Sequence, residues 1–147
     1  AKFIVTLHIP TMMRFTDTRL IALNYAEQRG ITPENSLYEG YSPFLPGHPI
    51  EISKDELENN NQYDYVILSS YMYDRFFAEP ERYADWITFY NSIRENNRLI
   101  FEVEPTPPAK NLLERSDDIL FYVKKCLKLD VEDRFGGPTI QIFELVR

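Results

Sequence analysis

The segment Tyr63–Ser70 (YDYVILSS) is the sequence feature that most constrains the fold. Its centre, Tyr65–Leu68, is an uninterrupted apolar run of the length of a strand rather than of a long helix. Such a run is typical of a strand that is covered on both faces, as in the interior of a mainly parallel sheet. We therefore expect a central sheet with helices packed on each side.

Other segments supply the helices and strands that this sheet requires. Residues 16–30 predict a helix that starts at Thr16-Asp17, with Asp17 in its first turn, and stops at Gly30, which favours the left-handed conformation of a helix end. Residues 74–97 predict a helical stretch that is interrupted near Pro80. The segments predicted as further strands are 3–9, 36–41, 98–104 and 139–146.

One segment, 116–127, is ambiguous because its start suits a helix cap while its apolar run 119–123 suits a strand equally well. Apart from it, the order of elements predicts an α/β fold in three layers, with helices packed on a mainly parallel sheet of four or five strands. At 147 residues, with 44% hydrophobic and 27% charged residues, the chain has the composition of one globular domain. We expect residues 1–147 to form a single soluble α/β domain.

Several classes of function are disfavoured by composition. The formal charge of −7 gives nucleic acid no bulk electrostatic attraction. A single cysteine, Cys126, and two distant histidines, His8 and His48, offer no metal site of the usual kind. No nucleophile elbow, phosphate-binding loop or dinucleotide fingerprint is present in the sequence, so we assign no cofactor and no catalytic residue.

Polar and aromatic residues follow two of the predicted strands. If strands 36–41 and 63–70 are parallel neighbours, their carboxyl ends form one crevice, where open α/β sheets bind ligands. Tyrosine rings stack on sugars, and an Asp/Arg pair can hold hydroxyls or a phosphate, so a glycan or a lipid headgroup suits this crevice. The candidate ligand- or acceptor-facing residues are Tyr38, Glu39, Ser70, Tyr71, Tyr73, Asp74 and Arg75.

The same residues also fit structural roles. Asp74 is placed to cap the following helix and Arg75 to form a surface ion pair, and both roles are commoner than binding sites. Glu39 and Asp74 could act as acid and base, yet the sequence fixes neither their separation nor their pKa values. Trp86 and its neighbouring aromatic residues suit the core face of a helix better than an exposed binding platform.

A series of motifs, taken in order, resembles the soluble domain that follows the transmembrane part of bacterial dolichyl-phosphate-mannose-protein mannosyltransferase-like glycosyltransferases. The motifs are DTR (17–19), YEGYSPFL (38–45), YDYVILSS (63–70), RFF (75–77), PERY (80–83), FY (89–90) and GPTIQIF (137–143). The similarity covers most of residues 17–146. The chain departs from the usual pattern at Asn24-Tyr25-Ala26, where Trp-Ile is commoner, and at Phe143, which replaces a tyrosine. Both departures look like core substitutions.

In that family a membrane domain transfers a sugar from a polyprenyl-phosphate carrier to an extracytoplasmic acceptor, and the catalytic acidic residue lies in a loop outside this domain. The resemblance implies a noncatalytic domain on the periplasmic or cell-surface side, tethered to the transmembrane domain of the same polypeptide. The chain begins at Ala1 without an initiator Met, which suits a piece of a larger membrane protein. The alternative is a free-standing carbohydrate- or lipid-headgroup-binding module, and a soluble enzyme comes third.

Overall fold

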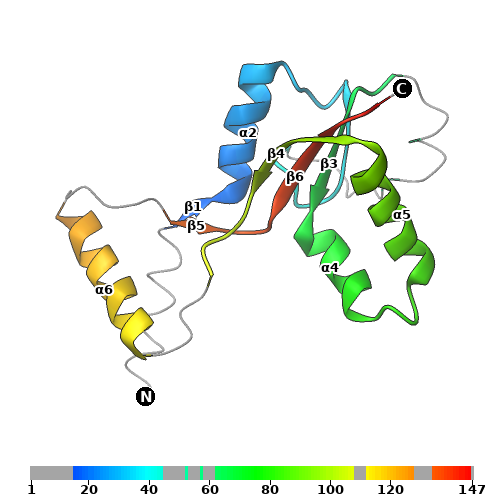
Figure 1. Cartoon of the computed structure of the whole chain (residues 1–147). Helices are drawn as coiled ribbons and strands as arrows, with labels where there is room; N and C mark the ends of the chain where they lie inside the picture. The colour runs from blue at the N-terminus through cyan, green and yellow to red at the C-terminus, as the bar shows by residue number, and fades with distance from the viewer. Residues whose placement is uncertain are drawn as a thin grey trace. The chain divides into compact units, whose positions relative to one another are not determined.

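A computed structural model describes residues 15–44, 52, 57, 62–107, 112–127 and 134–146. Its contacts fall into two compact units, which we describe separately (Figure 1). The sheet unit comprises residues 18–104 and 137–147, and the α6 unit comprises residues 1–17 and 105–136. The strand predicted at 3–9 lies outside the described residues. The expectation of one domain stays a prediction, because a grouping of contacts does not measure whether the units unfold together.

The sheet unit contains a mixed four-stranded sheet with strand order β2-β3-β6-β4. Only β2 and β3 are parallel, whereas β6 runs antiparallel to both of its neighbours, β3 and β4. The strands are β2 (Ser36–Tyr38), β3 (Tyr65–Ser69), β4 (Arg98–Val103) and β6 (Ile140–Glu144). The prediction of a mainly parallel sheet is therefore wrong. An apolar run indicates only that a strand is covered on both faces, and it does not indicate the direction of the neighbouring strands. β3 is covered on both faces although its neighbour β6 is antiparallel.

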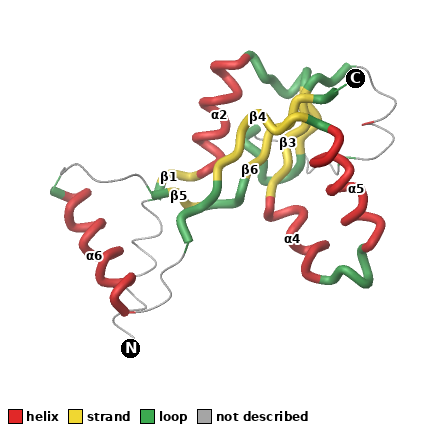
Figure 2. Tube along the Cα trace, in the orientation of Figure 1, coloured by secondary structure: helices red, strands yellow, loops and turns green. Residues whose placement is uncertain are grey.

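Helices cover both faces of this sheet (Figure 2). Ile67 packs on one face in a cluster with α2 (Thr18–Arg29), together with Ile140 and Ile142 of β6. Val66, Leu68 and Phe143 point to the other face and pack with α4 (Ser70–Ala78) and α5 (Ala84–Asn96). Successive side chains of a strand point to opposite faces, so the apolar run of β3 serves both clusters. The prediction of an α/β fold, with helices packed on a four-stranded sheet, is confirmed.

The helix boundaries agree with the sequence in two places and differ in a third. Helix α2 ends at Arg29 and Gly30 has φ of 68°, which confirms the predicted left-handed stop. The predicted interruption near Pro80 separates α4 from α5. Helix α4 begins at Ser70, however, so Asp74 lies inside the helix and cannot be its cap.

The α6 unit consists of one helix and one pair of short strands among its described residues. Helix α6 (Leu112–Cys126) contains most of the ambiguous segment 116–127, so the helical alternative is confirmed there. Strand β1 (Thr16–Asp17) pairs in parallel with β5 (Phe135–Gly136), and the Thr16 N–H donates to the Arg134 carbonyl at 3.0 Å. The prediction that a helix starts at Thr16-Asp17 is wrong by two residues, because these residues form the ladder with β5.

Candidate functional site

Segments that are distant in the sequence are joined by hydrogen bonds inside the sheet unit. The Thr18 hydroxyl, at the start of α2, donates to the Pro138 carbonyl at 2.6 Å. At the start of α4, the Ser70 N–H donates to the Thr139 carbonyl at 3.0 Å, and the Ser70 hydroxyl accepts from the Thr139 N–H at 2.9 Å. These bonds fix the beginnings of two helices to the chain that enters β6. We call this region the motif junction.

Glu39 is the buried carboxylate of the motif junction, with only 1% of its surface exposed. The Ser69 N–H donates to its Oε2 at 2.8 Å, and the Tyr90 hydroxyl donates to its Oε1. Burial raises the pKa of Glu39 from 4.5 to about 7, against the opposing effects of these two donors and of the Arg75 and Arg94 charges. Glu39 thus links the end of β2 to β3 and α5.

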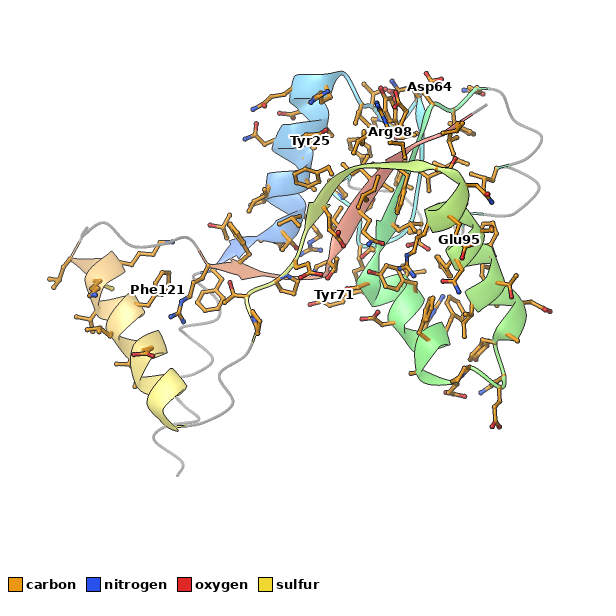
Figure 3. The ribbon with its side chains drawn as sticks, in the orientation of Figure 1. Tyr25, Asp64, Tyr71, Glu95, Arg98 and Phe121 are labelled. Atoms are coloured by element: carbon orange, nitrogen blue, oxygen red, sulfur yellow. The ribbon has the colours of Figure 1, made fainter. Side chains whose placement is uncertain are left out.

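Two exposed tyrosines, Tyr41 and Tyr71, lie beside this junction, and we call them the tyrosine pair. Each side chain is 55% exposed, and their ring centroids are 5.8 Å apart in an edge-to-face arrangement. Figure 3 labels Tyr71 at the start of α4. The carbonyl of Tyr41 accepts a hydrogen bond from the Ser69 hydroxyl at 3.3 Å. The pair is therefore anchored to the same strand end that holds Glu39.

The backbone of Tyr41 is in the left-handed region, with φ of 61°, and Tyr41 is the one non-glycine residue with positive φ in the described ranges. This conformation costs roughly 1–2 kcal/mol for an ordinary residue and is concentrated at functional sites. The next residue, Ser42, has a buried hydroxyl that makes no hydrogen bond within the described part of the chain. The turn after Glu39 thus combines backbone strain, an exposed ring and an unsatisfied hydroxyl.

The structure places Tyr38 and Tyr73 in packed positions. The Tyr38 ring meets Phe44 edge-on at 5.3 Å, and the residue packs against the α2-side cluster. Tyr73 is buried in the other cluster, the Arg94 guanidinium lies 4.5 Å from its ring centroid, and burial raises the pKa of Tyr73 to about 12. Both rings therefore contribute to packing.

Asp74 and Arg75 are exposed on α4, together with Tyr71. Partial burial raises the pKa of Asp74, while the Arg94 charge opposes that shift. The Arg75 guanidinium lies 4.6 Å from the Phe76 ring centroid, where it covers part of that ring.

Of the seven sequence-predicted residues, the structure thus leaves three exposed on one helix, while Glu39 and Ser70 are buried in the junction. The confirmed parallel pairing of β2 with β3 brings these strand ends together, as expected. Tyr41 ends the predicted strand 36–41 but is not among the candidate residues. Its distinguishing property is a positive φ, which no sequence pattern around a tyrosine reports.

Comparisons with protein-family models, curated proteins and solved structures gave no match to this chain. Within the described residues, no cluster of three or more His, Cys, Asp or Glu side chains could hold a metal ion. No helix in the same ranges combines the length and apolar character needed to cross a bilayer.

Proposed function

We propose that this chain is a noncatalytic extracytoplasmic domain of an integral membrane glycosyltransferase that uses a polyprenyl-phosphate sugar. In this proposal the sheet unit is a three-layer α/β scaffold that shapes the access of the acceptor. The observation that carries the proposal is the motif junction, where residues of the resembling motifs form internal hydrogen bonds. Motif residues that bond to one another inside the protein stabilise the fold instead of taking part in a reaction.

The environment of Glu39 supports a noncatalytic role. A carboxyl group with a pKa near 7 would suit a general acid. Both oxygens of Glu39, however, accept hydrogen bonds from the protein, and the side chain is almost fully enclosed. A substrate has no access to either oxygen without breaking the contacts with Ser69 or Tyr90, so the group serves the scaffold.

The tyrosine pair is the feature best suited to contact an acceptor glycan. Exposed aromatic rings stack on the apolar faces of sugars while their hydroxyls form hydrogen bonds. The edge-to-face contact between the two rings orders them before any ligand arrives, which lowers the ordering cost of binding. An exposed pair of rings offers few enclosed hydrogen bonds, so we expect an affinity of about millimolar.

We expect Tyr71→Ala and Tyr41→Asn each to weaken glycan binding about tenfold, because each removes one stacking ring. Asparagine suits position 41 because it tolerates the left-handed backbone. The measurement is a titration with mannose disaccharides followed by backbone amide chemical shifts. Tyr71→Phe, which keeps the ring, is the matched control and should retain binding. Shifts that cluster away from the tyrosine pair would contradict this assignment.

The isolated chain is expected to show no glycosyl transfer, because Glu39 is enclosed and the resemblance assigns the catalytic residue to another part of the protein. The assay uses a polyprenyl-phosphate mannose donor with peptide and glycan acceptors. The control is the heat-denatured chain. Turnover well above that control would overturn the noncatalytic assignment.

The second candidate is a free-standing module that binds carbohydrate or a lipid headgroup. It is favoured by the exposure of Tyr71, Asp74 and Arg75 on one helix, since these side chains require no membrane domain for binding. The coding sequence upstream of Ala1 separates the two candidates. Several long apolar segments would support the glycosyltransferase domain, whereas a single signal peptide would support the module.

A further inference from the structure

A continuous set of hydrogen bonds joins the buried carboxyl of Glu39 to the tyrosine pair. Glu39 Oε2 accepts from the Ser69 N–H at 2.8 Å, and the Ser69 hydroxyl donates to the Tyr41 carbonyl at 3.3 Å. Tyr71 lies two residues beyond Ser69, in the first turn of α4, and its ring meets the Tyr41 ring edge-on. Both rings thus depend on the position of one serine, and Glu39 holds the backbone of that serine.

Glu39 and Tyr41 are also joined through the backbone of the turn that follows β2. The Glu39 N–H donates to the Ile67 carbonyl at 3.2 Å, which extends the pairing of β2 with β3. Two residues later Tyr41 has its φ of 61°, and the buried Ser42 hydroxyl lacks a hydrogen-bond partner among the described residues. Opening this turn would release the backbone strain and expose the hydroxyl to water, and both changes lower the cost of opening.

The environment of Glu39 favours its neutral form. Burial is the largest effect on the pKa of Glu39 and raises it from 4.5 to about 7. The Tyr90 hydroxyl and the Ser69 N–H donate to the carboxyl, and the charged groups that act on it within the described ranges are the guanidinium groups of Arg75 on α4 and Arg94 on α5. These donors and charges oppose the effect of burial without overcoming it. An ionised Glu39 is therefore unfavourable inside the motif junction, and movement toward water relieves that cost.

We propose that Glu39 is a positioning residue for the tyrosine pair, which binds a glycan while Glu39 is a neutral acid and releases it when Glu39 is ionised. On ionisation the proton passes to solvent and the carboxylate moves toward water together with the turn that carries Tyr41. The bond from the Ser69 hydroxyl to the Tyr41 carbonyl then breaks, and the two rings separate. The proposal rests on the proposed function, because its ligand is the glycan assigned to the tyrosine pair.

The test measures the affinity for mannose disaccharides between about pH 5 and pH 8.5, below the range in which tyrosine hydroxyls ionise. We expect the wild-type affinity to fall about tenfold across this range, with a midpoint near pH 7. Glu39→Gln stays neutral and should bind at the high-pH end as the wild type binds at the low-pH end. Tyr90→Phe removes a donor that stabilises the ionised carboxylate, so its midpoint should lie at a higher pH.

The ring signals of Tyr41 and Tyr71 test the coupling without any ligand. Both should titrate with the same midpoint in the wild type and stay constant in Glu39→Gln, and added glycan should move the wild-type midpoint to higher pH by linkage. Rings that titrate in a chain that binds no glycan would overturn the proposed function and support the positioning role of Glu39. Glycan binding with an affinity independent of pH would overturn the positioning role and leave the proposed function standing.

Glu95→Gln is the matched control, because it removes an exposed carboxylate from α5 and should keep the wild-type pH dependence (Figure 3). A pH dependence that persists in Glu39→Gln would assign the titration to another group, such as His48, and would overturn the proposal. Circular dichroism across the same pH range follows the helices. A general loss of helix in the wild type at the high-pH end would show that ionisation unfolds the protein instead of opening one turn, which would also overturn the proposal.

Discussion

Between about pH 4.5 and pH 8 the wild-type protein is expected to lose about 3 kcal/mol of unfolding free energy relative to Glu39→Gln. The reason is burial of Glu39, which raises its pKa from 4.5 to about 7 in the folded protein. Well below pH 4.5 the carboxyl is protonated in both the folded and the unfolded protein. As the pH rises toward 7, the unfolded chain releases the proton while the folded protein retains it, so stability falls. Above pH 7 the full loss is present.

Glutamine is the matched variant because it has the shape of the protonated carboxyl. Its amide oxygen can accept from the Ser69 N–H, and its amide nitrogen can donate to the Tyr90 hydroxyl. Urea unfolding of both proteins across this pH range measures the difference between their unfolding free energies. Taking this difference removes the contributions of the other titrating groups, which the two proteins share. Curves that stay parallel would show that Glu39 ionises normally in the folded protein and would contradict its enclosure.

The features predicted well from the sequence are those that local chemistry determines. The apolar centre of β3 indicates that the strand is covered on two faces, whatever the direction of its neighbouring strands. Its side chains indeed belong to both hydrophobic clusters. Gly30 stops α2 because only a residue without a Cβ enters the left-handed region at no steric cost. The break near Pro80 follows from the missing N–H of proline.

The strand order could not be predicted because it depends on contacts between distant segments. The alternation in residues 139–146 identifies a strand, and Ile140 and Ile142 are buried as expected. Alternation states which side chains face the core, however, and says nothing about which strands are neighbours. The insertion of β6 between β3 and β4, antiparallel to both, is therefore visible only in the structure.

Only part of the candidate site can be predicted from the sequence, because the rest also depends on contacts between distant segments. The place of Glu39 at a strand end makes it a candidate, and the parallel pairing on which that prediction depends brings it to Ser69. Its second donor, Tyr90, is 51 positions away and belongs to the apolar face of α5. Helical spacing places that ring in the core, yet it carries no information about which carboxylate the hydroxyl reaches. The enclosure of Glu39 thus follows from tertiary packing.

The aromatic cluster between α4 and α5 is expected to contribute to stability rather than to binding. Phe76 is 6% exposed, its ring stacks on Trp86 with centroids 4.9 Å apart, and it meets Tyr83 edge-on at 5.2 Å. Its centroid is also 5.9 Å from that of Tyr90, which holds Glu39. Removing this ring leaves a cavity among groups that cannot close around it. The cluster therefore supports the motif junction from the α5 side.

Phe76→Ala is expected to reduce the unfolding free energy by about 3–5 kcal/mol, the range for loss of a buried aromatic side chain. Urea unfolding followed by the fluorescence of Trp86, the one tryptophan of the chain, measures the change directly. Tyr71→Ala is the matched control, because it removes an aromatic ring from the same helix at a position that is 55% exposed, and its effect should stay within about 0.5 kcal/mol. A Phe76→Ala protein as stable as the control, together with quenching of Trp86 by mannose disaccharides, would identify the cluster as a binding platform. Loss of stability without such quenching assigns the cluster to the core and leaves the tyrosine pair as the aromatic surface that a glycan can reach.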